Sequence, residues 1–150
     1  MPDGQPIVMT TMQEARDNCS GRPACAKPDV KATMTCESCS SGCGTWKLVV
    51  KVEGKCNIRY IDPKKIRVQY LPDFSAMLKH EKCHCADFRE AFQTVVNEAG
   101  AVAYGSQAEC DAARKNLDVG ARVTELSQDS RKHRGSKWRK GGTCYAVYRW

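Results

Sequence analysis

Ten cysteines spread along 150 residues constrain the fold of this chain more than any other sequence feature. Their number is even, and disulfides persist in oxidising compartments, whereas cytosolic thiols are kept reduced. We therefore expect a disulfide-stapled protein that works outside the cytoplasm, either secreted or periplasmic. The rival interpretation is a structural zinc site at Cys36, Cys39 and Cys43. Its first spacing is Cys-x-x-Cys, but no second ligand pair follows at the distance that such zinc sites use.

The length suits one domain with a single hydrophobic core. We expect residues 1–150 to form that domain, with a cysteine-rich loop segment at 1–45 and a catalytic core at 46–150. No apolar run approaches the roughly 20 residues that cross a bilayer, so no membrane span is predicted. The first residues also lack an apolar segment behind a basic start. We expect that a leader was removed, that the domain was excised from a longer chain, or that export needs no leader.

The patterning predicts strands followed by helices. Residues 1–45 are rich in Pro, Gly, Ser, Thr and Cys and predict loops with one short helical turn at 13–19. Alternation of apolar and polar residues then predicts an antiparallel β-meander. Its strands are expected at 45–54, 56–61 and 65–71, with turns at Glu53-Gly54 and Asp62-Pro63, and a further strand at 143–150.

The period changes to that of helices after Leu71-Pro72. Asp73 or Ser75 can cap a helix that runs to about Ala99 and ends at Gly100. Ser106 and Glu109 form a capping box for a second long helix, which Gly120 interrupts. The fold class predicted is therefore α+β, with a meander followed by two long helices.

The run His80-Glu81-Lys82-Cys83-His84 lies in the first of these helices. Residues four apart share one helical face, so His80 and His84 can bind one zinc ion. Glu81 lies on the adjacent flank, where it can act as a general base toward a metal-activated water. This His-Glu-x-x-His spacing is what metal-assisted amide hydrolysis requires.

The simpler interpretation of the motif is two surface histidines on an amphipathic helix. Two observations favour the metal. The motif follows a β-meander near the start of a long helix, which is where zincin peptidases carry it. The chain also holds only three histidines, two in the motif and His133 downstream. Since catalytic zinc takes three protein ligands and a water, we expect His133 to be the third.

Other residues remain open as ligands or supports. Asp87 is three residues past His84 and can ligate or support from nearby, and Asp129 can orient the His133 ring. The remaining glutamate candidates are Glu90, which points partly away, Glu98, and Glu109, which the capping box explains better. Cys83 and Cys85 are expected to tie the helix to neighbours, for instance through Cys110. A tyrosine can donate a hydrogen bond to a developing oxyanion, and the candidates are Tyr104, Tyr145 and Tyr148.

Taken together, these residues resemble the DUF922 group of predicted bacterial zinc-dependent peptidases. The resemblance covers roughly residues 46–135 and runs through Leu71-Pro72, His80-Glu81-x-x-His84, a second helix, and Asp129-x-x-x-His133. It departs where Arg134 separates His133 from Gly135, because that group has His-Gly there. The resemblance implies a zincin-like fold and a peptidase-type zinc site.

We therefore expect a zinc metallopeptidase that hydrolyses amide bonds, as an exported bacterial enzyme or toxin-type effector. Its partners would be a protein, peptide or peptidoglycan-peptide substrate and an immunity protein. The alternative is a non-catalytic, disulfide-rich module. In that case the net charge of +7 and the basic segment 131–140 would bind an anionic partner. A DNA-associated protease is disfavoured because ten cysteines argue against a cytosolic site, and nucleic acid is therefore not an expected partner.

Overall fold

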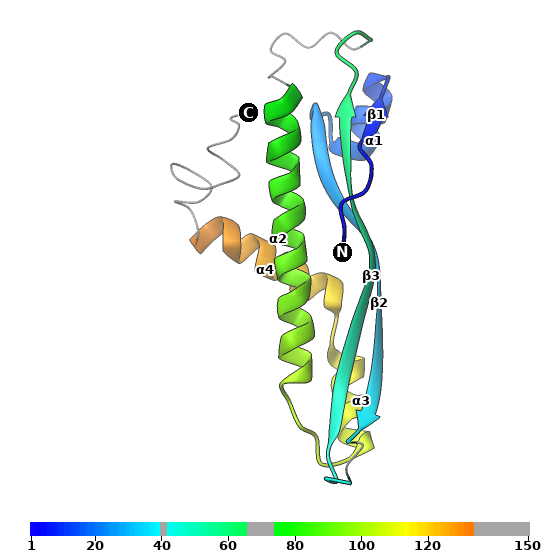
Figure 1. Ribbon diagram of the computed structural model, residues 1–150, viewed down its shortest axis with the longest axis vertical. Helices are drawn as coiled ribbons and strands as arrows, with labels where there is room; N and C mark the ends of the chain where they lie inside the picture. The colour runs from blue at the N-terminus through cyan, green and yellow to red at the C-terminus, as the bar shows by residue number, and fades with distance from the viewer. Residues whose placement is uncertain (40–41, 66–73, 134–150) are drawn as a thin grey trace.

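The computed structural model describes residues 1–39, 42–65 and 74–133, and at 74, 76 and 128–133 it describes the backbone alone. The described part is α+β and elongated: a three-stranded sheet runs along the molecule with helices beside it (Figure 1). In chain order the elements are β1 (Ile7–Met9), α1 (Met12–Cys19), β2 (Ala24–Ser38), β3 (Trp46–Ile61), α2 (Phe74–Gly100), α3 (Gln107–Asn116) and α4 (Val119–His133).

The sheet is dominated by the antiparallel hairpin of β2 and β3, paired from Ala24↔Tyr60 to Ser38↔Trp46. The short β1 pairs with the end of β3 in parallel, so the strand order is β1-β3-β2. Opposite charges face each other across the hairpin and favour this register. These pairs are Asp29↔Lys55, Lys31↔Glu53 and Glu37↔Lys47.

Two predictions for this region are wrong. Residues 1–45, expected to be loops, carry β1, α1 and β2, although the short helix within them was anticipated. Apolar and polar residues alternate in β2 from Ala26 to Glu37, and its burial alternates with them, so the strand was a signal that the sequence interpretation missed. Glu53-Gly54 is not a turn, since β3 continues through it. Gly54 has φ of 138° and pairs with Val30, and a Cβ there would lie 2.2 Å from the carbonyl oxygen of Asp29.

The helix α2 runs alongside the hairpin from its open end and stops short of its turn, where α3 lies (Figure 1), and it confirms the predicted first helix within a residue or two. Its buried side chains repeat at helical spacing and pack on the inward face of β3. One core forms where Phe92 and Val95 meet Leu48 and Val50. A second forms nearer the start of α2, where Cys85 meets Cys56 and Ile58 of β3.

The second long helix is in fact two helices, α3 and α4. The capping box is confirmed, because Ser106 accepts a hydrogen bond from the Glu109 N–H at 3.2 Å and the Glu109 side chain accepts one from the Gly105 N–H at 2.9 Å. The interruption lies at Leu117-Asp118 and not at Gly120. There the Asp118 carboxylate accepts a hydrogen bond from the Ala121 N–H at 3.0 Å and starts α4.

Disulfides staple these elements together, as the cysteine count predicted. Four are defined: Cys19–Cys25, Cys36–Cys110, Cys39–Cys43 and Cys56–Cys85. Cys83 is disulfide-bonded as well, and the described chain holds no free cysteine. The rival zinc site at Cys36, Cys39 and Cys43 is therefore excluded. The expected link from the first helix to Cys110 is also wrong, since Cys85 bonds to β3 and Cys110 to β2.

These disulfides fit an extracellular protein. Among the described helices, none combines the length and the apolar character needed to cross a bilayer. The strands predicted at 65–71 and 143–150, and most of the basic segment 131–140, fall outside the described residues.

Candidate metal centre

The first half of α2 brings His80, Glu81 and His84 together. One possible ligand atom from each lies within 4.8 Å of the other two. The two Nε2 atoms are 2.9 Å apart, and the rings meet edge to face at a centroid distance of 4.6 Å. The i, i+4 spacing places the rings one turn apart on one face, as the sequence predicted. These three residues can hold a metal ion.

The site lies against the sheet and not on an outer helical face. His80 is 5% exposed and Glu81 is 3% exposed, while His84 is half-buried. Beneath them, the Cys56–Cys85 disulfide joins α2 to β3 one residue past His84. Burial of polar groups is costly unless they are paired. The simpler interpretation, two solvated surface histidines, is therefore wrong for His80, and partly wrong for His84.

Glu81 is held in an environment that disfavours its charge. Burial raises the pKa of Glu81 from 4.5 to about 7, against a hydrogen bond from the Ala26 backbone and the positive charge of Arg22, which both lower it. Ala26 and Arg22 belong to the start of β2 and the loop before it. A carboxyl group with a pKa near 7 can accept and return a proton at neutral pH, as a general base must.

The donor set fits zinc after a small adjustment. Tetrahedral zinc with Zn–N bonds near 2.05 Å separates two nitrogen ligands by about 3.3 Å. The Nε2 atoms are 2.9 Å apart, so in this structure one ring donates a hydrogen bond to the other. A small rotation of the two rings that moves the Nε2 atoms a few tenths of an ångström further apart would let both nitrogen lone pairs point at one ion. Two imidazole nitrogens and one carboxylate are ligand types that zinc accepts.

The third ligand remains a prediction. His133 is the last residue of α4, and its side chain lies outside the described ones, as does that of Asp129. Asp87 is half-buried on α2 and does not belong to the His80, Glu81 and His84 group. Glu81 itself is near enough to ligate, which differs from the base role predicted for it.

The other glutamate candidates are placed elsewhere. Glu98 accepts two hydrogen bonds from Arg122, at 2.9 and 3.2 Å, and lies about 21 Å along α2 from His84 at 1.5 Å per residue. Glu109 is used by the α3 cap. Glu90 is exposed. None of the three joins the candidate metal group.

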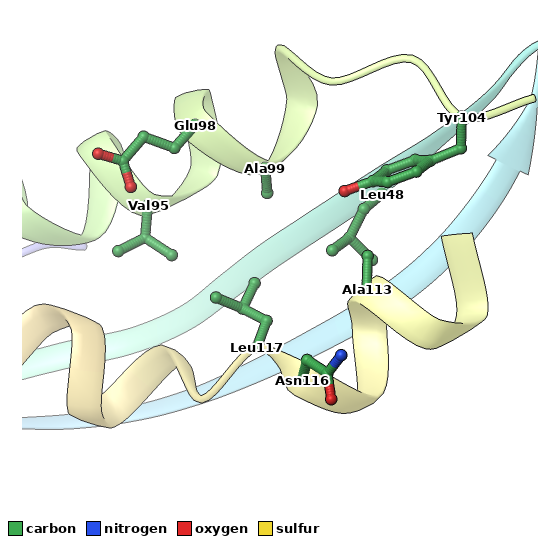
Figure 2. Close-up of a pocket in the computed structure, with 8 residues that line it drawn as sticks. All are labelled: Leu48, Val95, Glu98, Ala99, Tyr104, Ala113, Asn116 and Leu117. Atoms are coloured by element: carbon green, nitrogen blue, oxygen red, sulfur yellow. The ribbon is translucent and has the colours of Figure 1, made fainter. Parts of the chain in front are cut away.

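Two pockets lie further along α2. One, of about 280 Å³, is lined by Leu48, Val95 and Leu117 with Tyr104 at its edge (Figure 2). The other, of about 520 Å³, lies between α2 and β3 over Val50, Val52 and Phe92. Neither includes a residue of the metal group. The backbone of Tyr104 hydrogen-bonds with that of Trp46 at the far end of the hairpin, and its side chain lines the first pocket and not the metal group, so nothing in the described structure supports the oxyanion role predicted for it. Tyr145 and Tyr148 are outside the described residues.

Sequence reasoning missed the contribution of Arg22 and Ala26. Both precede Glu81 by more than 50 residues, and nothing in the local pattern links them to it. The alternation of apolar and polar residues that begins at Ala26 could have marked this segment as a strand, but not its contact with Glu81. Comparison of the chain with family models, curated proteins and solved structures found no match. The resemblance to the DUF922 group therefore rests on the sequence motifs alone.

Proposed function

We propose that this protein is a zinc-dependent hydrolase of amide bonds, a metallopeptidase that works outside the cytoplasm. One observation carries the proposal: two histidines and a glutamate with a pKa near neutrality share one buried, disulfide-anchored site. The His-Glu-x-x-His spacing and the resemblance to predicted zinc peptidases add to it.

Each residue has a role set by its position. His80 and His84 would hold the ion, and His133 would be the third ligand, with Asp87 or a glutamate as the alternative. Zinc bound there would supply a Lewis acid for the scissile carbonyl and would lower the pKa of a bound water to about 7. Glu81 removes the proton of the attacking water and delivers it to the leaving amine.

The local structure suits Glu81 for this task. The Ala26 N–H bonds to its carboxylate and limits the rotation of the side chain. Exclusion of water raises its proton affinity toward the working pH. The Cys56–Cys85 disulfide holds the turn of α2 that carries His84 against β3. This link keeps the candidate metal ligands and Glu81 in fixed positions relative to one another.

The disulfides and the proposed metal chemistry support a compartment and a class of substrates. Disulfides throughout the fold support a secreted or periplasmic setting for the proposed enzyme. An amide in a protein and one in a peptidoglycan peptide need the same metal chemistry, so both are substrates to test. A toxin-type role, with an immunity protein as partner, agrees with this setting.

The test is zinc content by elemental analysis of purified wild type and of His80→Ala, His84→Ala and His133→Ala. One zinc per chain in wild type, lost in each variant, is the expected result. Glu98→Gln is the control, because Glu98 is engaged by Arg122 and lies far from the motif. Loss of zinc in the first two variants alone would move the third ligand to Asp87 or a glutamate.

Hydrolysis is then followed with casein and with a peptidoglycan-peptide mixture. Glu81→Gln should abolish cleavage while zinc content stays at one per chain. Full activity of Glu81→Gln would refute the mechanism. Absence of zinc in wild type after metal is added back would refute the metal centre and leave the anionic-partner module as the better account.

A further inference from the structure

One edge of the sheet is paired only near its two ends. β2 covers one side of β3 along almost its whole length. On the other side, the Cys56 N–H donates to the Pro2 carbonyl at 3.0 Å. At the far end of the same side, the backbones of Trp46 and Tyr104 exchange two hydrogen bonds of 2.8 Å. β1 pairs with this side only at 59–61. In the described part of the chain, no segment pairs with β3 between Trp46 and Cys56 on this side.

The alternation of β3 fixes which backbone groups face this open edge. The N–H and C=O of one residue point to one neighbouring strand, and those of the next residue point the opposite way. Trp46 and Cys56 both direct these groups away from β2. The even-numbered residues between them therefore do the same, among them Leu48, Val50 and Val52. Described residues form no hydrogen bond to these groups on the open side. Because Val50 is only 3% exposed, a partner for its N–H and C=O would be favourable.

The larger of the two pockets, of about 520 Å³, lies beside this open edge. Val50 and Val52 line it from β3, and the apolar side chains of Phe92 and Val96 line it from α2. Met1 also lines it, and Met1 begins the segment that pairs with the same edge of β3. A strand added to the edge would direct every second side chain into this pocket. The walls favour apolar side chains there.

The other side chains of an added strand would lie beside lysines. The odd-numbered residues of β3 turn to the outer face of the sheet, where Lys47, Lys51 and Lys55 are exposed. Lys47 and Lys55 each face an acidic residue of β2, but Lys51 faces Thr33. Opposite charges on neighbouring strands attract each other. An acidic residue of the added strand is therefore favoured opposite Lys51, in agreement with the net charge of +7.

We propose that the open edge of β3 binds an extended peptide segment of a partner protein, which adds a strand to the sheet and carries an acidic residue between two apolar ones. Donors and acceptors on alternate residues match those of a peptide strand. The apolar residues would face Val50 and Val52, and the acidic one Lys51. Residues 2–4 of the chain already bind the adjacent stretch of this edge in the same way. The edge of β2, by contrast, carries Pro28, a residue that hinders added strands. This interaction does not depend on the proposed hydrolase activity.

The test is an NMR titration of isotope-labelled protein with the peptide acetyl-Val-Glu-Val-Glu-Val-amide. Its pattern is the same in both directions, so it suits a parallel or an antiparallel strand. The peptide should show nuclear Overhauser contacts to the amide protons of Val50 and Val52. The amides of Val49 and Lys51 point to β2 and should keep their hydrogen-exchange rates. A peptide with lysine in place of both glutamates should bind more weakly. Absence of binding at about millimolar peptide, or equal binding of the two peptides, would overturn the proposal.

Two proline variants form a matched pair. Ala32 and Val52 face each other across the hairpin, and their N–H groups point to opposite edges of the sheet. Val52→Pro removes a donor from the open edge and places the proline ring there, so it should abolish binding. Ala32→Pro makes the same change at the edge of β2 and should bind like wild type. Circular dichroism checks that both variants fold. Binding retained in folded Val52→Pro, or lost in folded Ala32→Pro alone, would overturn the proposal.

Lys51→Glu gives the decision if a proline variant does not fold, because Lys51 is exposed and its side chain is not part of the core. This variant should bind the glutamate peptide roughly threefold more weakly or worse, and should prefer the lysine peptide. Lys82→Glu makes the same charge change on an exposed position of α2 and should leave the preference unchanged. The same preference in Lys51→Glu as in wild type would overturn the proposal. So would a wild type that sediments as a dimer and a Val52→Pro variant that sediments as a monomer, because a second copy would then occupy the edge.

Discussion

Glu81→Gln should stabilise the metal-free protein at alkaline pH, although it should destroy hydrolysis. The substitution replaces a buried carboxyl group by a neutral side chain of nearly the same shape. Its amide oxygen can still accept the hydrogen bond from the Ala26 N–H. What disappears is the cost of holding a negative charge where 97% of the residue surface is removed from water, since Glu81 is 3% exposed.

The magnitude follows from the pKa of Glu81. The folded protein holds it at about 7, against 4.5 for the free side chain. Between these pH values the folded state binds more protons than the unfolded chain, so the free energy of unfolding falls as pH rises through this window. Above pH 7 the loss is complete, and at about 1.4 kcal/mol per pKa unit it amounts to roughly 3 kcal/mol. The stabilisation by Glu81→Gln should therefore be small at pH 5 and about 2–3 kcal/mol at pH 8.

The assay is urea unfolding of both proteins, with disulfides intact and EDTA present, at half-unit steps from pH 5 to 8. Taking the difference between variant and wild type at each pH removes the contributions of groups that both proteins share. Glu53→Gln is the control, because Glu53 is exposed on β3 and its charge is solvated. A difference between Glu81→Gln and wild type that stays flat across this range, or a variant that is less stable at pH 8, would refute the burial of this charge.

Two further predictions concern the scaffold around the site. Replacing Cys56 and Cys85 together by alanine opens a disulfide that spans 29 residues and should lower the free energy of unfolding by about 3–4 kcal/mol. Zinc affinity by competition with a chelator should fall as well, and unchanged affinity would show that this disulfide does not position His84. Gly54→Ala should cost roughly 2–3 kcal/mol, because its φ is 138° and the new Cβ would meet the Asp29 carbonyl at 2.2 Å. Gly100→Ala, with no atom within 4 Å of its Cβ, should leave the urea midpoint unchanged or slightly raised, and a similar loss in both variants would contradict this account of Gly54.

The sequence by itself determined the features that are local along the chain. The i, i+4 spacing of His80 and His84 set them on one helical face whatever the surroundings. The bounds of α2 and the cap at Ser106 follow from short-range hydrogen bonding and helical periodicity, and both appear in the structure. The even cysteine count likewise predicted disulfides, because that inference depends on composition and compartment and not on geometry.

Only the tertiary structure decided the features that join distant segments. The alternation of residues 26–37 is typical of a strand, but only the structure shows that β2 pairs with β3 over 15 residues and in which register. The partners of Cys85 and Cys110 depend on which elements pack together. The proton affinity of Glu81 is set by burial against the start of β2, beside Ala26 and Arg22. Burial and electrostatics depend on all the neighbours of a residue in space. The motif could therefore predict the candidate metal ligands, but the pKa of Glu81 could be assigned only from the tertiary structure.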